Sequence, residues 1–420
     1  MAEELITRSA DRRDGPEERR SLRRDVSVPA LLAGLVCIAV SFSGPLVVVL
    51  AAASAGRLDA AHTASWIWAV AIGSGLPGLL LSWWTRTPVI TAWSTPGAAL
   101  LVTSLGAYPY REAVGAFLVS GVLVTLFGVT GLFGRLIAAI PAGIVNAMLA
   151  GILFSFGAGI FGAVHGAPAL VLGSFAAFLL AKRLVPRYAV PVALVAGGVL
   201  AAVTVGLPLH LGSGGPTVPV FTVPAFSGPA TVGLALPLTI VALVSQNAPG
   251  LGVMRAFGYR PDDRLLIGAT GGVSVLLAPF GSPGVNLAAI TAAICAGPEN
   301  HPDPRRRYVA GMSVGLLYVL VGSFGGLLVS LFTGLPKELI AVVAGVALLA
   351  SLQGSLAAAV ADEHGRDAAV VTFLASASGM SLLGIGSAFW GLLLGLGTHL
   401  VLRARPTWLR RGHARPGSST

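Results

Sequence analysis

Two short segments of this chain combine hydroxyl, proline and glycine residues inside long apolar stretches. They are Ser94-Thr95-Pro96-Gly97 and Gly281-Ser282-Pro283-Gly284. A hydroxyl residue before proline is typical of a helix start, because the hydroxyl accepts from free N–H groups and proline suits the first turn. The start of a helix carries partial positive charge and unpaired donors, which favour an anion. The two segments therefore predict helices that begin inside a membrane and face an anion.

Neutral polar residues and one tryptophan accompany these segments. The candidate substrate-binding residues are Ser43, Trp93, Ser94, Thr95, Ser245, Gln246, Asn247, Ser282 and Asn286. The run 245–247 is the most informative, because three adjacent polar groups inside lipid are costly unless they line a site. Trp93, with Phe42 and Phe280, would add aromatic surface for an apolar ligand body. The alternative for any single residue is helix packing, since Ser, Thr and Asn often join membrane helices.

Acidic residues are missing from the interiors of the apolar stretches. All seventeen lie in the tails, in loops or at the first residues of a stretch. A sodium or other cation site would use carboxylates inside the membrane, so the expected ligand is a small anion with an apolar body. His399 is the one histidine well inside an apolar stretch, and we interpret it as a packing residue rather than a proton relay.

No further motif indicates catalysis or metal binding. The sequence has no nucleotide-binding loop, catalytic triad or zinc spacing, and Asp362-Glu363-His364 is interpreted as a solvated loop. Its two cysteines give no disulfide framework. We therefore expect no metal, no cofactor and no catalytic residue. An intramembrane enzyme is disfavoured because the apolar stretches hold no nucleophile–base set and no acidic pair.

The elements that must position these residues are membrane helices. Of the 420 residues, 55% are hydrophobic and only 10% are charged, and the mean hydropathy is +0.84. A soluble domain of this size could not bury so much apolar surface, so the fold class is an all-α polytopic membrane protein. We expect about fourteen spans, at 28–53, 64–84, 88–106, 112–133, 137–162, 167–183, 189–206, 230–256, 264–280, 282–297, 308–333, 337–360, 368–384 and 386–402.

The basic residues predict the orientation of these spans. With a cytoplasmic N-terminus and alternating spans, 24 of the 27 Lys and Arg residues lie inside, and Arg57, Arg111 and Lys337 lie outside. Cytoplasmic loops of membrane proteins carry such an excess. Both termini are therefore expected in the cytoplasm, with the chain in the cell membrane. The pI near 10.5 is interpreted as this topology and not as nucleic-acid binding.

Fourteen spans divide into two sets of seven, and an odd-numbered unit must be inverted in the membrane. Four short similarities recur in the same order, including Pro96-Gly97 with Pro283-Gly284. Spans 3 and 10 are expected to be half-helices that start at Thr95 and Ser282 after short extended segments, an arrangement that marks transporter binding sites. The expected divisions are a disordered cytoplasmic tail (1–27), a first repeat (28–206), an extracytoplasmic loop (207–229), a second, inverted repeat (230–402) and a basic cytoplasmic tail (403–420).

In these motifs the chain resembles the bacterial benzoate/proton symporter family. The resemblance covers nearly all the spans and is carried by WSTPGAAL at 93–100, SQNAPG at 245–250, GSPGVNL at 281–287, Asp303-Pro304 and Arg306-Arg307-Tyr308. It implies import of a benzoate-like aromatic carboxylate, with protons as possible co-substrate. It also implies a core domain of spans 1–4 and 8–11, a gate domain of spans 5–7 and 12–14, elevator-like movement of the core, and a possible homodimer through the gate domain.

One departure from related architectures bears on the substrate. Nucleobase transporters of this architecture place acidic substrate-binding residues in span 8 and at the start of span 10. This chain has Ser245, Gln246, Asn247 and Asn286 there, which argues against uracil or xanthine and leaves the proton-carrying group unidentified. The open alternatives are a transporter, exchanger or channel for another small anion, or for a nucleobase, on the same scaffold.

Overall fold

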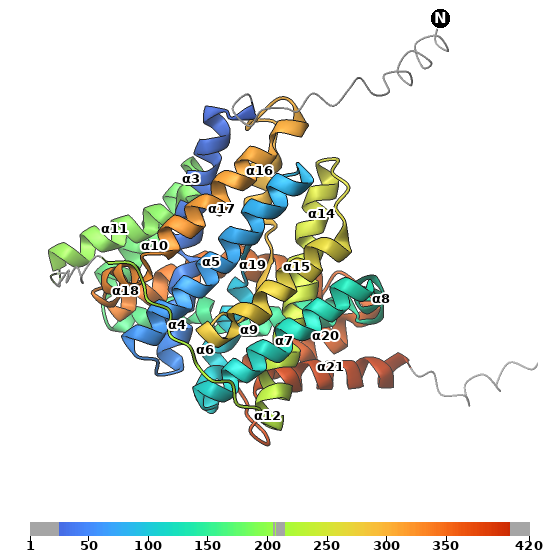
Figure 1. The fold of residues 1–420 in the computed structure, drawn as a ribbon. Coiled ribbons are helices and arrows are strands. Elements are labelled where there is room, and N and C mark those ends of the chain that lie inside the picture. The colour runs from blue at the N-terminus through green and yellow to red at the C-terminus, as the bar shows by residue number, and fades with distance from the viewer. Residues whose placement is uncertain (1–24, 205, 207–214, 404–420) are drawn as a thin grey trace, which may run out of the picture.

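The structure is a computed structural model that describes residues 25–204, 206 and 215–403, and it is almost wholly helical (Figure 1). Residues 1–24 and 404–420 of the expected tails, and 207–214 of the expected loop, lie outside the described residues. Several helices begin where a side chain accepts from the first free N–H groups. Ser27, Asp59, Ser94, Ser227 and Asp262 play this part.

Helices and one short strand make up the first half of the chain. They are α3 (Val28–Ser43), α4 (Pro45–Ala55), α5 (Ala60–Thr85), β1 (Thr91–Trp93), α6 (Thr95–Ser104), the 3₁₀ turn η1 (Leu105–Ala107), α7 (Tyr110–Thr130), α8 (Phe133–Ala139), α9 (Ala142–Gly162), α10 (Pro168–Leu184) and α11 (Ala189–Thr204).

The second half opens with one long helix, 228–256, in which two π-helical turns alternate with α-helix. Its parts are α12 (Gly228–Ala230), η4 (Thr231–Ala235), α13 (Leu236–Ile240), η5 (Val241–Asn247) and α14 (Ala248–Ala256). It is followed by α15 (Asp263–Leu277), η6 (Ala278–Phe280), β2 (Val285–Leu287), α16 (Ile290–Ala296), α17 (Tyr308–Gly322), α18 (Gly325–Thr333), α19 (Lys337–Ala359), α20 (Arg366–Ala377) and α21 (Ser387–Arg403).

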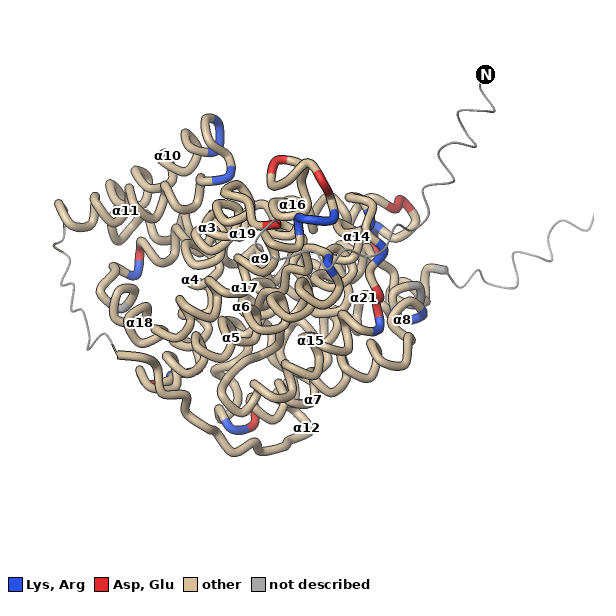
Figure 2. Tube along the Cα trace, turned by 45° about the horizontal axis from the view of Figure 1, so that its top comes forward, with Lys and Arg blue, Asp and Glu red and all other residues tan. Residues whose placement is uncertain are grey.

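The chain is a multi-pass membrane protein. Eight helices in the described part are long and apolar enough to cross a membrane, and the pair α17–α18, bent by 70°, makes a ninth if it forms one span. Every one of the fourteen predicted spans contains a helix, but those at spans 3, 6, 10, 13 and 14 are shorter. Figure 2 shows the charged residues near the helix ends and loops, as a membrane environment requires.

The helix packing has the symmetry expected of two related halves. The three most extensive contacts join α9 to α19 (spans 5 and 12), α5 to α17 (spans 2 and 11) and α7 to α15 (spans 4 and 9). Spans 6 and 7 (α10 and α11) also pack together, as do spans 13 and 14 (α20 and α21). If each span is replaced by its counterpart in the other half, the pair 2–11 becomes 9–4, the pair 6–7 becomes 13–14, and the pair 5–12 is unchanged. The contacts also separate α9–α11 and α19–α21 from the remaining helices, with fewer contacts between the two groups.

The strands β1 and β2 cross antiparallel inside the bundle, with Ala92 opposite Asn286 and Trp93 opposite Val285. Two serines anchor the extended segments on either side of this crossing. Ser82 of α5 accepts from the Val89 N–H at 3.1 Å, and Ser274 of α15 accepts from the Val285 N–H at 2.8 Å. Non-helical backbone is tolerated at membrane depth only where its polar groups are satisfied in protein. The two serine hydroxyls and the pairing of β1 with β2 satisfy polar groups of this extended backbone.

The start predicted for the second half-helix is wrong. Span 3 begins as predicted, with α6 starting at Thr95 behind its cap Ser94, but α16 starts at Ile290, eight residues after Ser282. The reason is backbone geometry, because Gly281 and Gly284 take positive φ values of 103° and 143° and turn the chain into β2 before any helix forms. Extended segments do precede both half-helices, as predicted.

Candidate functional site

The start of α6 is the best-formed helix terminus near the strand crossing. Ser94 Oγ accepts from the Gly97 N–H at 2.9 Å, and Pro96 occupies the first turn. A Cβ on Gly97 would lie 2.9 Å from that oxygen, so a residue without a side chain is needed for the cap. The remaining first-turn N–H groups of a ten-residue helix thus lie deep in the protein, where they attract negative charge.

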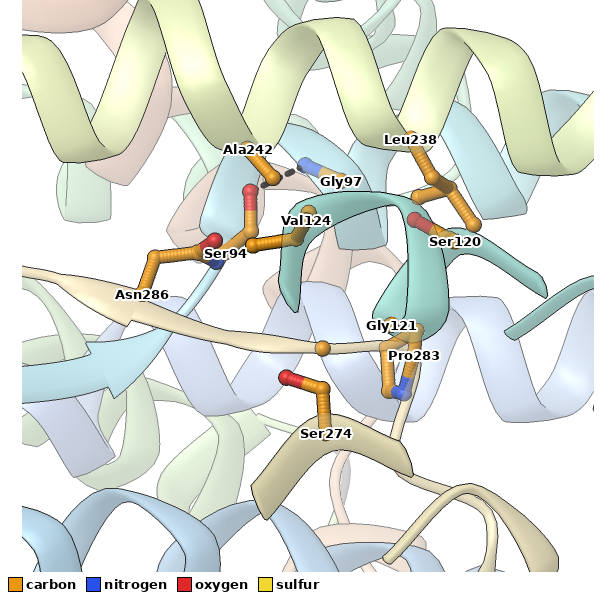
Figure 3. Close-up of a pocket in the computed structure, with 11 residues that line it drawn as sticks. Ser94, Gly97, Ser120, Gly121, Val124, Leu238, Ala242, Ser274, Pro283 and Asn286 are labelled. Carbon is orange, nitrogen blue, oxygen red and sulfur yellow. Dashed lines mark hydrogen bonds between the residues drawn. The ribbon is translucent and has the colours of Figure 1, made fainter. Parts of the chain in front are cut away.

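A small cavity lies against this terminus, between β2, the long helix 228–256, α7 and α15 (Figure 3). Its polar lining comes from Ser94, Ser120, Ser274 and Asn286, and Leu238, Ala242 and Val124 give it apolar walls. In Figure 3 the Asn286 amide is turned toward Ser94. The cavity measures about 10 Å³, room for about one water molecule. This conformation is therefore closed around the site.

Two asparagines at the crossing have polar atoms without a protein partner. The Asn286 side chain is 2% exposed, and neither its Oδ1 nor its Nδ2 makes a hydrogen bond to any described residue. Asn247 is fully buried, and its Oδ1 accepts from the Leu287 N–H at 2.9 Å while its Nδ2 has no described partner. Buried amides are nearly always hydrogen-bonded, so both Nδ2 groups are candidates to donate to a ligand.

The other predicted residues divide between the crossing and its surroundings. Ser282 is fully buried, and its hydroxyl, like that of half-buried Ser245, has no described hydrogen-bond partner. Thr95 opens α6, and Gln246 is half-buried in η5 next to Asn247. Ser43 donates to the Val40 carbonyl at the end of α3, which is a packing bond.

The aromatic residues lie outside the cavity lining. Trp93 packs edge-on against Phe42 and Tyr318, with ring centroids 5.4 and 5.5 Å away. Phe280 contacts Trp68 and Phe221 at 5.8 and 5.7 Å. The cavity walls in this conformation are thus aliphatic. The buried Nε1 of Trp93 has no described hydrogen-bond partner.

Sequence reasoning missed the two serines that the helices α7 and α15 bring to the cavity. Ser120 accepts from the Thr239 hydroxyl at 3.1 Å, and Ser274 holds β2. A signal for Ser274 was present, because Ser82 stands at the corresponding place in the first repeat and anchors its extended segment in the same way. Among the described residues that line the cavity, none is acidic. The one buried carboxylate in the described part, Asp25, accepts from Tyr308 elsewhere in the fold.

The chain is similar to known membrane proteins over most of its length. A family model described as "Benzoate membrane transport protein" (BenE) matches residues 24–401. Inner membrane protein YdcO of Escherichia coli (strain K12) is 41% identical over 383 residues, which are 89% of this chain and 96% of that protein. A benzoate membrane transport protein of Acinetobacter baylyi (strain ATCC 33305 / BD413 / ADP1) is 38% identical over 390 residues, which are 91% of this chain and 97% of that protein.

Two solved structures share the fold. A structure of SLC26A9 superposes with a TM-score of 0.60 at 16% identity, covering 89% of this chain and 65% of that longer chain. The transmembrane domain of the cyanobacterial bicarbonate transporter BicA gives 0.52 at 15% identity, covering 90% and 97%. These two identities are low, so the likeness is one of fold. The family match and the two relatives are decisive: the chain belongs to the BenE family of benzoate membrane transport proteins, a family of transporters and not of enzymes.

Proposed function

We propose that this protein imports a benzoate-like aromatic carboxylate as a secondary active transporter. The observation that carries the proposal is the pair of unpartnered Nδ2 groups, those of Asn247 and Asn286, at the strand crossing, with the capped start of α6 at the same cavity as Asn286. Donors without a nearby carboxylate suit an anion, and the protein's membership in the benzoate transport family suggests which anion. The Acinetobacter relative carries the same substrate in its name.

In this proposal the carboxylate and the ring occupy different parts of the site. The carboxylate accepts from the Asn247 and Asn286 Nδ2 groups and from N–H groups at the start of α6. The ring lies against Leu238, Ala242 and Val124, the apolar walls of the present cavity. Because that cavity holds about one water, the surrounding helices must separate before the ring can enter. Substrate entry is therefore coupled to helix movement.

The movement proposed is of elevator type, with a core of spans 1–4 and 8–11 and a gate of spans 5–7 and 12–14. The separation of helix contacts into two groups supports this division. We further place fourteen spans as two inverted repeats, 28–206 and 230–402, joined by the extracytoplasmic loop 207–229. Both tails, 1–27 and 403–420, would lie in the cytoplasm, in an inner membrane like that named for YdcO. A homodimer through the gate domain would leave the core free to move.

Proton symport completes the proposal, although no acidic residue lines the described cavity. Uptake of labelled benzoate by cells expressing the protein tests both parts. The expected result is saturable uptake that is faster at low external pH and is abolished by a protonophore. Saturable uptake that is insensitive to the protonophore would contradict proton symport but support benzoate as a substrate. Uptake no faster than in cells without the protein would contradict the proposal that benzoate is a substrate.

A small inorganic anion is the second candidate substrate. The fold likeness to a murine solute carrier described as an anion transporter favours it, with a TM-score of 0.56 at 14% identity. Competition against labelled benzoate separates the two candidates. Excess substituted benzoate should block uptake, whereas bicarbonate, sulfate and uracil should not. Exchange or channel transport of a small anion would instead appear as inhibition by bicarbonate or sulfate.

A further inference from the structure

A hydrogen bond joins the two groups of helices at one end of the molecule. Tyr108, which directly follows η1, donates its hydroxyl proton to the carbonyl of Gly384 at 2.6 Å. Tyr108 belongs to the group that holds the cavity, and Gly384 lies in the turn between α20 and α21 of the other group. The basic residues predict that both loops lie on the extracytoplasmic side.

The acceptor is presented by a rigid turn. Leu382 and Ile385 exchange backbone hydrogen bonds of 3.1 and 3.0 Å, and the Trp390 indole N–H donates to the Leu382 carbonyl at 3.1 Å. The central residues Leu383 and Gly384 have φ values of 54° and 72°, as a tight hairpin turn requires. Positive φ at a leucine is strained, and such strain persists only where the surroundings hold it and often serves function.

The donor side is equally well defined. A Cβ on Gly233 of η4 would lie 2.2 Å from the Tyr108 hydroxyl oxygen, so a side chain at this position would displace the hydroxyl. Close by, a Cβ on Gly386 would lie 3.2 Å from Ser104 Oγ, at the last residue of α6. The extracytoplasmic end of α6 is therefore in close contact with the turn.

The same half-helix connects this contact to the substrate site. Its first turn is capped by Ser94 at the cavity, and it runs through η1 to Tyr108. Ten helical residues span about 15 Å and behave as a rod, so a tilt at one end displaces the other. A rearrangement of the first turn of α6 around bound substrate would thus displace the Tyr108 hydroxyl.

We propose that the Tyr108–Gly384 hydrogen bond is a latch that closes the substrate route on the extracytoplasmic side. It rests on the proposed function, since it must break for the core to open outward and re-form once substrate is enclosed. Tyr108 is a positioning residue here: it sets the equilibrium between outward-open and closed states without touching substrate.

Labelling of a cysteine at Ser104 in intact cells tests the latch. Ser104 is 5% exposed at the contact, and Ser104→Cys changes one atom. The native Cys37 and Cys295 are fully buried, so the natural chain gives the background rate for a membrane-impermeant maleimide. Adding Tyr108→Phe should raise the labelling rate about fivefold, equivalent to one hydrogen bond of about 1 kcal/mol. Gly384→Ala, which disfavours the positive φ of the acceptor, should act in the same direction.

Tyr110→Phe is the matched control, because the Tyr110 ring packs on His62 within the same group of helices, at 5.8 Å. An unchanged rate in Tyr108→Phe, or an equal rise in Tyr110→Phe, would overturn the latch. Uptake gives a second readout: a larger outward-open fraction should lower the apparent KM for external benzoate by up to about fivefold. If the natural chain did not transport benzoate, the proposed function would fail, while the labelling rates would still decide the latch.

Discussion

At the scale of single residues, Asn247 in η5 and Asn286 in β2 both lie at the strand crossing but differ in their hydrogen bonds. The Asn247 carbonyl oxygen accepts from the Leu287 N–H and so holds β2, while its Nδ2 remains unpaired. The Asn286 amide has no described partner on either atom. An unsatisfied buried polar group costs about 1–3 kcal/mol, and a bound carboxylate would remove that cost. One residue is thus both structural and a candidate ligand, and the other is a candidate ligand alone.

Leucine substitutions should separate these two roles. We expect Asn286→Leu to weaken benzoate uptake at least tenfold with unchanged thermal stability, because no protein hydrogen bond is lost. Asn247→Leu should weaken uptake and also destabilise the protein by about 1–3 kcal/mol, because the Leu287 N–H loses its acceptor. Uptake kinetics and thermal unfolding of the purified variants give both quantities. Asn146→Leu, in α9, is the control; normal affinity in Asn286→Leu would show that its amide is not a ligand.

At the scale of elements, the segments Ser94-Thr95-Pro96-Gly97 and Gly281-Ser282-Pro283-Gly284 look alike in sequence but fold differently. Ser94 caps α6, whereas Ser282 precedes a turn and strand β2, and its hydroxyl has no described partner. The flanking glycines decide this difference through their positive φ values. Of these two segments, the first alone therefore places a capped helix terminus at the cavity, and the proposed anion binding depends more on the side chains of Asn247 and Asn286.

Alanine substitutions test this difference between the two serines. Ser94→Ala should lower the free energy of unfolding by about 1 kcal/mol, since it removes an N-cap. Ser282→Ala should leave stability within about 0.5 kcal/mol, since it removes no protein hydrogen bond. Thermal unfolding of both purified variants measures the difference. Equal losses would mean that Ser282 stabilises its segment after all.

The elements that sequence predicts best are those marked by local chemistry. Ser94, Pro96 and the apolar run after them are sufficient to place the start of α6, because capping depends on neighbours in the chain. The start of α16 was not predictable in this way, since it depends on β2 pairing with a strand almost 200 residues earlier. Ser120 lines the cavity because α7 packs against helices that are distant in sequence, which local patterns do not predict either. Local signals therefore predicted the half-helix, and tertiary contacts completed the site.

At the scale of the whole molecule, contacts between distant loops agree with the expected alternation of spans. Arg111 donates to the Val223 carbonyl, and both residues are expected outside. The Tyr259 hydroxyl donates to the Pro304 carbonyl, both expected inside, and Tyr308, at the cytoplasmic end of its expected span, donates to Asp25 of the expected cytoplasmic tail. A missed or additional span between these loops would place the partners on opposite sides of the membrane. These three contacts agree with the expected alternation, and the direction of insertion can be measured separately.

Cysteine labelling of two exposed positions measures that direction. Val218, 81% exposed in the segment before α12, should react with an impermeant maleimide in intact cells once changed to cysteine. Glu363→Cys, in the loop between α19 and α20, should react only after the membrane is opened. The two fully buried native cysteines contribute little background. The opposite pattern would reverse the predicted orientation of the whole bundle.

The central claim is that an aromatic carboxylate binds at the crossing of β1 and β2, and Asn286→Asp tests it with the smallest change. Aspartate has nearly the shape of asparagine, so the fold is retained, but it replaces the donor with a negative charge beside the start of α6. Repulsion in a poorly solvated site amounts to several kcal/mol. Calorimetric titration of benzoate into both purified proteins should show binding to the natural chain and at least a hundredfold weaker binding to Asn286→Asp. Equal affinities at neutral pH would place the carboxylate elsewhere and contradict the account.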